Sequence, residues 1–256
     1  MAKEELWKDD GLFILPYRPN YFMPLSYNPS PNNDVLPAGS ASLKEIETKF
    51  QISLKVPLAD HLLSHDIATY LAYTQLSYWQ TYNKQESSLL RDSDYEPEFF
   101  LQFNSTRRIG SWTNRYNRLG YDHQSNGQQD PLSRSWNRIY AEFVLDYGNV
   151  MVSVKPWYRI TGPPEQDSNP NMWKYLGYGE LRGAMTFWKS CEASLLFRNN
   201  LRIPDNKGAI ELGWAFPIAG RMKGYIQYFN GYGESLIDYN SAVNRISAGL
   251  SFSDWL

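Results

Sequence analysis

The feature that most constrains the fold of this chain is a series of long stretches in which apolar and polar residues alternate. Between Glu45 and Val56 every second residue is apolar or threonine, and the residues between them are charged or polar. The alternation returns over 150–160 and over 245–252. Successive side chains of a strand point to opposite faces. Globular strands usually have about five or six residues, whereas a tilted membrane strand needs about 9–11. The pattern therefore predicts a transmembrane β-barrel.

We expect an all-β, antiparallel barrel of about twelve strands, since single-chain bacterial barrels have an even number. Short connections such as Gly148-Asn149 alternate with longer polar ones such as 126–133, which is typical of outer-membrane barrels. Residues 1–43 are expected to be an N-terminal extension and linker that holds a candidate first strand, and residues 44–256 the barrel. The candidate strands are 11–27, 44–57, 67–82, 95–105, 113–125, 134–147, 150–160, 173–187, 190–201, 207–218, 221–232 and 242–255.

Composition agrees with this interpretation and excludes some others. No run of about 18 apolar residues is present, so no transmembrane helix is expected. The 19 tyrosines and 9 tryptophans suit the aromatic girdles of a membrane barrel. The net charge of −2 gives no electrostatic footprint for a nucleic-acid partner. The lone Cys191 excludes an intramolecular disulfide. A soluble sandwich or lipocalin-like barrel remains an alternative, because its strands also alternate.

The sequence begins with the charged run Met1-Ala2-Lys3-Glu4-Glu5 and has no apolar signal-peptide core there. Two explanations fit: a cytosolic protein, or a mature form whose signal peptide has been removed and a starting Met added. The barrel interpretation favours the second, with the protein in the bacterial outer membrane.

One short motif carries candidate chemistry. His123 and Ser125 are two residues apart on a predicted strand, so they share a face. In a hairpin centred on Asp130-Pro131, His123 lies opposite Asn137, with Cβ atoms about 4.5–5.5 Å apart. Asn137 has the parity of the apolar residues of its strand, which places all three side chains on the outer, lipid-facing wall. A β-bulge would reverse that orientation.

This arrangement predicts acyl transfer. His123 can take the proton of the Ser125 hydroxyl near neutral pH, and Asn137 can accept the Nδ1 hydrogen and fix the tautomer. Backbone N–H groups of Ser125 and Gly127 can form an oxyanion hole, with Gly127 permitting a sharp turn. The alternative is a strand that merely enters an Asn-Gly turn.

Several runs, in order and with compatible spacing, resemble the outer-membrane phospholipase A family. The longest is the segment 121–140, which reads Tyr-Asp-His-Gln-Ser-Asn-Gly-Gln-Gln-Asp-Pro-Leu-Ser-Arg-Ser-Trp-Asn-Arg-Ile-Tyr. The others are Ser87-Ser88 followed by Tyr95-Glu96-Pro97, Lys155-Pro156-Trp157-Tyr158, and the segment 231–240. The matches run from about residue 44 to the end of the chain.

The resemblance implies a calcium-dependent phospholipase, active as a homodimer, that hydrolyses sn-1 and sn-2 acyl esters of phospholipids and lysophospholipids. It assigns Ser125 as nucleophile, His123 as base and Asn137 as the partner of the base. It also implies a Ca²⁺ site made by the Ser133 hydroxyl and the Gln128 carbonyl, with a carbonyl at the position of Ser87 from the second subunit.

Gln75 matches a polar residue in the dimer interface of that family. It shares parity with the apolar residues of its strand, so a partner barrel would satisfy an amide that is otherwise costly in lipid. Two alternatives stay open: a non-catalytic outer-membrane channel or adhesin, and a soluble lipid-binding β protein.

Overall fold

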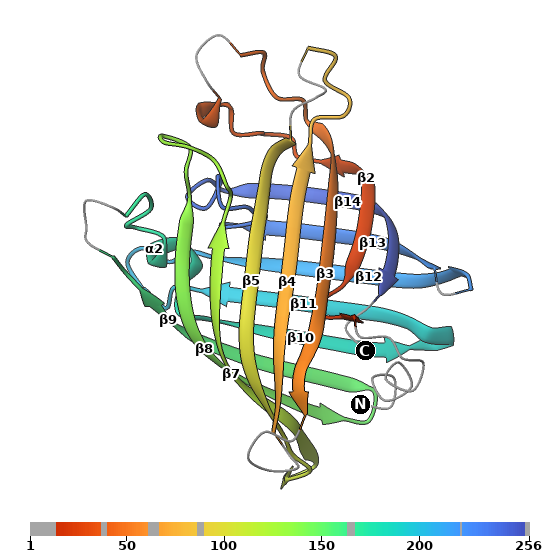
Figure 1. The fold of residues 1–256 in the computed structure, drawn as a ribbon. Coiled ribbons are helices and arrows are strands. Elements are labelled where there is room, and N and C mark those ends of the chain that lie inside the picture. The colour runs from red at the N-terminus through yellow and green to blue at the C-terminus, as the bar shows by residue number, and fades with distance from the viewer. Residues whose placement is uncertain are drawn as a thin grey trace.

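The chain folds into a closed antiparallel β-barrel (Figure 1). The computed structural model describes residues 14–36, 40–60, 67–85, 90–162, 167–220 and 222–253. Within those ranges fourteen strands form one sheet, and pairing of β3 with β4 closes it into a ring of twelve long strands. The strands are β1 (Leu15–Pro16), β2 (Asn20–Tyr27), β3 (Ile46–Asp60), β4 (Ile67–Trp79), β5 (Leu90–Asn104), β6 (Arg108–Ile109), β7 (Trp112–Ser125), β8 (Ser135–Tyr147), β9 (Val150–Ile160), β10 (Gly179–Phe187), β11 (Cys191–Asn199), β12 (Gly208–Ala219), β13 (Met222–Gly231) and β14 (Val243–Ser253).

The predicted fold class and strand number are confirmed, and the differences lie at strand ends. The strand expected over 173–187 starts only at Gly179, because Trp173–Leu176 forms the short helix α2, which ends at Gly177 with φ of 71°. β5 begins at Leu90, five residues before its predicted start at Tyr95. Two 3-10 turns complete the described elements, η1 (Asn33–Val35) and η3 (Trp188–Ser190). No helix in the described part of the chain is long and apolar enough to cross a membrane.

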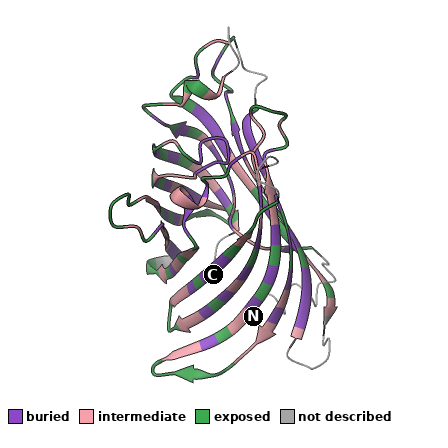
Figure 2. Ribbon diagram, turned by 90° about the vertical axis from the view of Figure 1, so that its left-hand side faces the viewer, coloured by how far each residue is buried: buried purple, intermediate pink, exposed green. Residues whose placement is uncertain are grey.

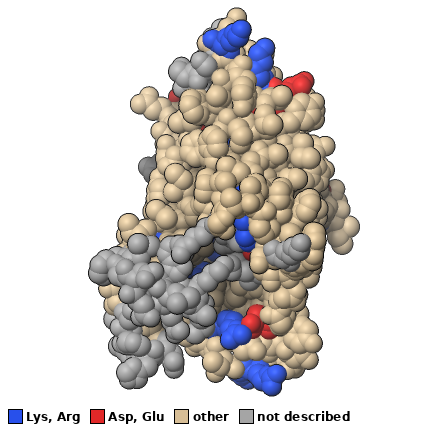
Figure 3. Space-filling model, turned by 90° about the vertical axis from the view of Figure 1, so that its right-hand side faces the viewer, with Lys and Arg blue, Asp and Glu red and all other residues tan. Residues whose placement is uncertain are grey.

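The distribution of apolar and polar side chains is the reverse of that in a soluble protein: many apolar side chains are exposed and many charged ones are buried. Along the strands buried and exposed residues alternate (Figure 2), and the exposed ones are largely apolar. On β8, Ile139 and Phe143 are 47% and 46% exposed, whereas Arg138 and Glu142 are buried inside the barrel. Figure 3 shows a broad uncharged band on one face, with the charged side chains above and below it. A polar interior and an apolar outer wall are what a bilayer requires of a barrel.

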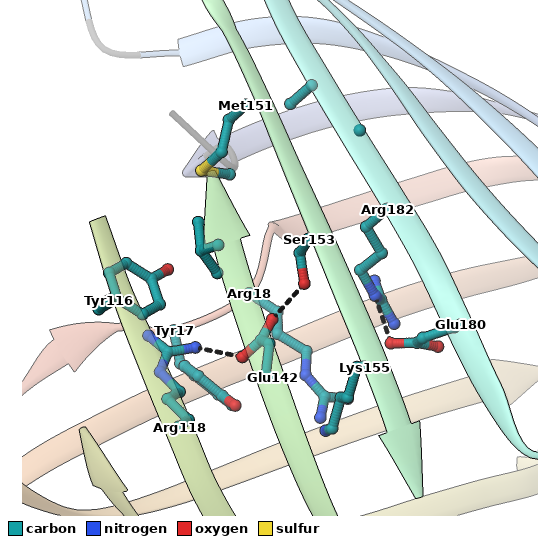
Figure 4. A pocket seen from close by; sticks show the side chains of 13 residues that line it. Tyr17, Arg18, Tyr116, Arg118, Glu142, Met151, Ser153, Lys155, Glu180 and Arg182 are labelled. Carbon is teal, nitrogen blue, oxygen red and sulfur yellow. Dashed lines mark hydrogen bonds and ion pairs between the residues drawn. The ribbon is translucent and has the colours of Figure 1, made fainter. Parts of the chain in front are cut away.

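Ion pairs fill much of the lumen, beside a cluster of buried apolar side chains around Phe100 and Tyr140. Near the middle, Arg18 from the break between β1 and β2 pairs with Glu96 and Glu98, two inward residues of β5. Arg118 donates to Glu142 at 3.0 Å, and the same carboxylate accepts from the Ser153 hydroxyl (Figure 4). Two cavities of about 60 and 110 Å³ lie among these side chains, which is room for a few water molecules.

The loop between β13 and β14 folds back into one end of the barrel. The Leu236 and Ile237 amides donate to the carboxylates of Asp94 and Asp92, each at 3.0 Å. This contact explains why β5 starts earlier than predicted. The polar residues at its start face a buried loop rather than solvent. The long loops, including the one between β7 and β8, therefore lie at an end whose lumen is plugged.

We expect Glu234, which lies in this loop, to make a contribution to the free energy of unfolding that is lost in acid. Burial opposes its charge, but Arg245 and Lys49 outweigh burial and lower the pKa of Glu234 from 4.5 to about 2. A group with a depressed folded pKa stabilises the fold above its unfolded pKa. We expect that contribution to be lost as the pH falls from about 4.5 toward 2. Unfolding temperatures of the wild type and Glu234→Gln at pH 6 and pH 3 should converge at the lower pH. An unchanged difference would contradict the prediction.

Gly249 lies at the seam where β14 meets β2, the first long strand. The register shifts between Ala248 and Leu250, and a Cβ at Gly249 would lie 2.6 Å from the Met23 Cα and against the Phe22 carbonyl oxygen. Because backbone cannot yield as a side chain can, Gly249→Ala should destabilise the barrel by about 1–3 kcal/mol. Thermal unfolding in detergent micelles measures this. Gly183→Ala, whose nearest atom is the Met151 carbonyl oxygen at 3.9 Å, is the control and should have no such effect.

Candidate active site

β7 and β8 bring the candidate triad together in the predicted register. His123 pairs with Asn137 and Ser125 with Ser135. The only shift in this ladder lies between Asn114 and Tyr116, so no bulge reverses the site. Residues of the same parity are exposed on the outer wall, whereas the intervening Asp122 is fully buried in the lumen. The structure therefore places these side chains on the outer wall of the barrel, at the end with the long loops.

His123 and Asn137 form a direct hydrogen bond of 2.8 Å between Nδ1 and Oδ1. Because an amide oxygen can only accept, this contact places the hydrogen on Nδ1 and leaves Nε2 with a free lone pair. A second donor also reaches this oxygen, since the Tyr121 hydroxyl donates to Oδ1 at 2.7 Å. The sequence interpretation did not include Tyr121 in the site, because parity places its side chain on the same face as His123 but does not show which atom the hydroxyl reaches. The two bonds to Oδ1 fix the orientation of the Asn137 amide relative to the His123 ring.

The Ser125 hydroxyl lies at the end of β7, where the chain turns. Its Oγ accepts a hydrogen bond from the Gly127 amide at 3.2 Å, and among the described residues no hydrogen bond joins it to His123. Such contacts are often open in unliganded enzymes. Gly127 has φ of 65°, in the left-handed region that favours glycine, and the Tyr95 ring packs against it. The chain therefore turns at Gly127 in a conformation that suits glycine.

Asn126, between Ser125 and Gly127, anchors the loop that follows. Its side chain is buried and donates to the Leu132 carbonyl at 3.0 Å, while its Oδ1 accepts from the Arg134 amide at 2.9 Å. Its own amide donates to the Arg134 carbonyl at 3.0 Å. These bonds close the loop 126–134 on itself and thereby fix the turn at Gly127. Sequence reasoning treated Asn126 only as part of an Asn-Gly turn signal.

Two of the three predicted calcium ligands lie in this loop. Within the described residues, neither the Gln128 carbonyl oxygen nor the Ser133 hydroxyl takes part in a hydrogen bond, so both oxygens are available to a cation. The Gln128 side-chain Nε2 donates to the Arg91 carbonyl at 3.4 Å, which ties the loop to β5. Neutral oxygen donors suit Ca²⁺. Ser87, the third predicted ligand, lies outside the described residues.

Gln75 lies on β4 next to the exposed Leu71 and Tyr73, as predicted. Its amide is already partnered within one chain: Tyr73 donates to Oε1 at 3.2 Å, and Nε2 donates to the Ser77 hydroxyl at 3.1 Å. The argument that this amide needs a second barrel is weakened by these bonds. Its place in a dimer interface stays a prediction.

A buried acidic cluster lies on the opposite, luminal side of β5 and β7. Glu96, Glu98 and Asp122 approach one another closely enough to suggest a metal site. Three cations compensate them: Arg138 contacts Asp122 at 2.7 Å and Glu96 at 2.9 Å, and Arg18 and Lys155 contact Glu98. The cluster is therefore an ion-pair network that supports the strands of the site.

Comparison with known proteins identifies the family. The model of the family described as Phospholipase A1 matches residues 1–252. Phospholipase A1 of Klebsiella pneumoniae is 37% identical over 248 residues, which cover 96% of this chain and 84% of that protein. Phospholipase A1 of Escherichia coli strain K12 is 36% identical over the same length.

Solved structures agree. Outer membrane phospholipase A from Escherichia coli has a TM-score of 0.89 and 36% identity, covering 95% of this chain and 99% of that chain. The Salmonella typhi outer membrane phospholipase dimer with bound calcium has a TM-score of 0.88 and 37% identity, covering 94% and 92%. The closed barrel with its apolar outer wall and these relatives lead to one conclusion: this chain is a bacterial outer-membrane β-barrel and belongs to the phospholipase A1 family.

Proposed function

We propose that this protein is a calcium-dependent phospholipase that hydrolyses sn-1 and sn-2 acyl esters of phospholipids and lysophospholipids. The observation that carries the proposal is the His123–Asn137 hydrogen bond beside Ser125 on the lipid-facing wall. A site there cannot serve transport through the lumen, and it meets membrane lipids directly. The ion-paired lumen also argues against the channel alternative.

In this proposal Ser125 is the nucleophile. Its side chain rotates toward His123, whose Nε2 takes the hydroxyl proton as Oγ attacks the ester carbonyl carbon. Asn137 accepts the Nδ1 hydrogen throughout and stabilises the imidazolium that forms. His123 then gives the proton to the leaving alcohol, which departs as the lysolipid, and a fatty acyl ester remains on Ser125. Water, activated by the same imidazole, releases the fatty acid.

Rotation of Ser125 also prepares the oxyanion hole. In this structure the Gly127 amide donates to Ser125 Oγ. When Oγ turns toward His123, that N–H is released and, with the Ser125 amide, can donate to the negatively charged oxygen of the tetrahedral intermediate. Because the Asn126 bonds fix this turn, the donors are positioned before the substrate arrives.

Calcium fits the loop beside this hole. The Gln128 carbonyl oxygen and the Ser133 hydroxyl would hold it, together with the backbone at Ser87 of a second copy. When bound, the ion would supply electrostatic stabilisation of negative charge near the site. A calcium-bound dimer of the Salmonella typhi relative supports the proposal that this protein also works as a homodimer.

Calcium removal tests this part of the proposal. Fatty acid release from phosphatidylcholine in mixed micelles should fall at least about tenfold in excess EDTA and recover with added calcium, as expected for a lost electrostatic contribution. Ser133→Ala should need more calcium for half-maximal activity, because one oxygen ligand is lost. Ser111→Ala, which changes an exposed turn serine at the opposite end of β7 from Ser125, is the control. Full activity of the wild type in the chelator would contradict the proposal.

A further inference from the structure

The hydroxyl of Tyr121 is an unusual group for its position. Tyr121 is 43% exposed on the outer wall, among the apolar side chains of Leu119, Ile139 and Phe143. A hydroxyl that faces hydrocarbon is costly without a hydrogen-bond partner. Here the partner is Asn137 Oδ1, at 2.7 Å. The Tyr121 hydroxyl is therefore hydrogen-bonded to Asn137, the same side chain that is hydrogen-bonded to His123.

The strand register explains how the hydroxyl reaches this atom. Tyr121 pairs across the ladder with Ile139, so Asn137 is its diagonal neighbour, within reach of an aromatic side chain. Oδ1 accepts from Tyr121 at 2.7 Å and from His123 Nδ1 at 2.8 Å. A carbonyl oxygen has two lone pairs, and both are used.

The orientation of the Asn137 amide decides whether the site can work. With the oxygen toward His123, Nδ1 carries the hydrogen and Nε2 is free to act as a base. With the NH₂ group toward His123, Nδ1 must accept, the hydrogen moves to Nε2, and the ring cannot take the proton of Ser125. The reversed amide would also leave the Tyr121 hydroxyl hydrogen without an acceptor, because the outer wall around it faces lipid hydrocarbon.

We propose that Tyr121 is a positioning residue of the active site: its hydroxyl keeps the oxygen of the Asn137 amide toward His123. This inference rests on the proposed function and adds a fourth residue to the site. Such a residue is needed because an amide has two unlike ends. A carboxylate has two equivalent oxygens, so an aspartate at position 137 would not need to be oriented.

That asymmetry provides the experiment. Tyr121→Phe removes only the hydroxyl, and it is made in the wild type and in Asn137→Asp. In the wild type we expect kcat for phosphatidylcholine to fall about three- to thirtyfold, the effect of one lost hydrogen bond, with KM changed less than about twofold. In Asn137→Asp the same change should lower kcat by less than about twofold. The rate of Ser125 labelling by hexadecanesulfonyl fluoride gives the same comparison if the Asp variant turns over too slowly.

The controls separate this inference from the proposed function. Tyr147→Phe removes another exposed phenol, at the other end of β8, and should leave kcat unchanged. Equal losses from Tyr121→Phe in both backgrounds, or a raised KM with kcat unchanged, would overturn the inference while the triad stands. Wild-type hydrolysis by Ser125→Ala, assayed alongside, would overturn the proposed function and the inference with it.

Discussion

Replacing Ser125 with alanine should abolish phospholipid hydrolysis, lowering kcat by about four orders of magnitude or more. The hydroxyl is the atom that forms the acyl ester, and His123 cannot compensate for its loss. Fatty acid release from mixed micelles with calcium measures the effect. The variant should still migrate differently on gels before and after boiling, because Ser125 is the last residue of β7 and its hydroxyl accepts an exposed hydrogen bond from the Gly127 amide.

Ser135→Ala is the matched control for this variant. Ser135 is the cross-strand partner of Ser125. The substitution therefore removes a neighbouring hydroxyl from the same position of the strand ladder. It should keep nearly full activity. If the Ser135 variant is inactive and the Ser125 variant is not, the nucleophile has been assigned to the wrong serine.

Replacing Arg245 with methionine should destabilise the barrel by about 3–5 kcal/mol, the cost of leaving buried charges without their partner. Arg245 is 2% exposed and contacts Glu234 at 2.7 Å and Glu47 at 2.8 Å. It also donates to the Ser26 hydroxyl at 3.0 Å, so it joins β14, β3, β2 and the loop that plugs the barrel. Equilibrium unfolding by urea in the presence of lipid vesicles measures the difference.

Arg115→Met is the matched control for that change. Arg115 pairs with Asp146 at 2.7 Å, but its side chain is 47% exposed. Exposed pairs contribute about 0–1 kcal/mol, so this variant should unfold almost as the wild type does. Equal destabilisation by the two substitutions would show that the luminal network is not the stabilising element proposed here.

The arrangement of the strands and the triad could be predicted because both depend on local regularities. Alternation with a period of two fixes which residues face outward, and one hairpin centre fixes which residues are opposed. His123 and Asn137 therefore met in the predicted register. Residues 173–176 were less predictable, because a four-residue helix gives too short a pattern to separate from a strand end.

Contacts between distant strands could not be predicted in the same way. Parity places Glu96 and Glu98 inside the barrel, but it does not show that Arg18, from a break in the first strand, reaches across to them. The polar start of β5 read as a loop because its partner, the segment at Leu236 and Ile237, is far away in sequence. The Tyr121 hydroxyl was missed for another reason: parity gives the face of a side chain but not the direction of its tip.

The most direct test of the central claim is covalent labelling of the intact protein in detergent with a long-chain sulfonyl fluoride, with and without calcium. Mass spectrometry of the digested product then locates the modified residue. We predict a single sulfonylated residue, Ser125, labelled faster with calcium and not labelled in His123→Ala. Modification of another residue, or none while phospholipid hydrolysis continues, would contradict the claim that Ser125, activated by His123 on the outer wall, is the nucleophile.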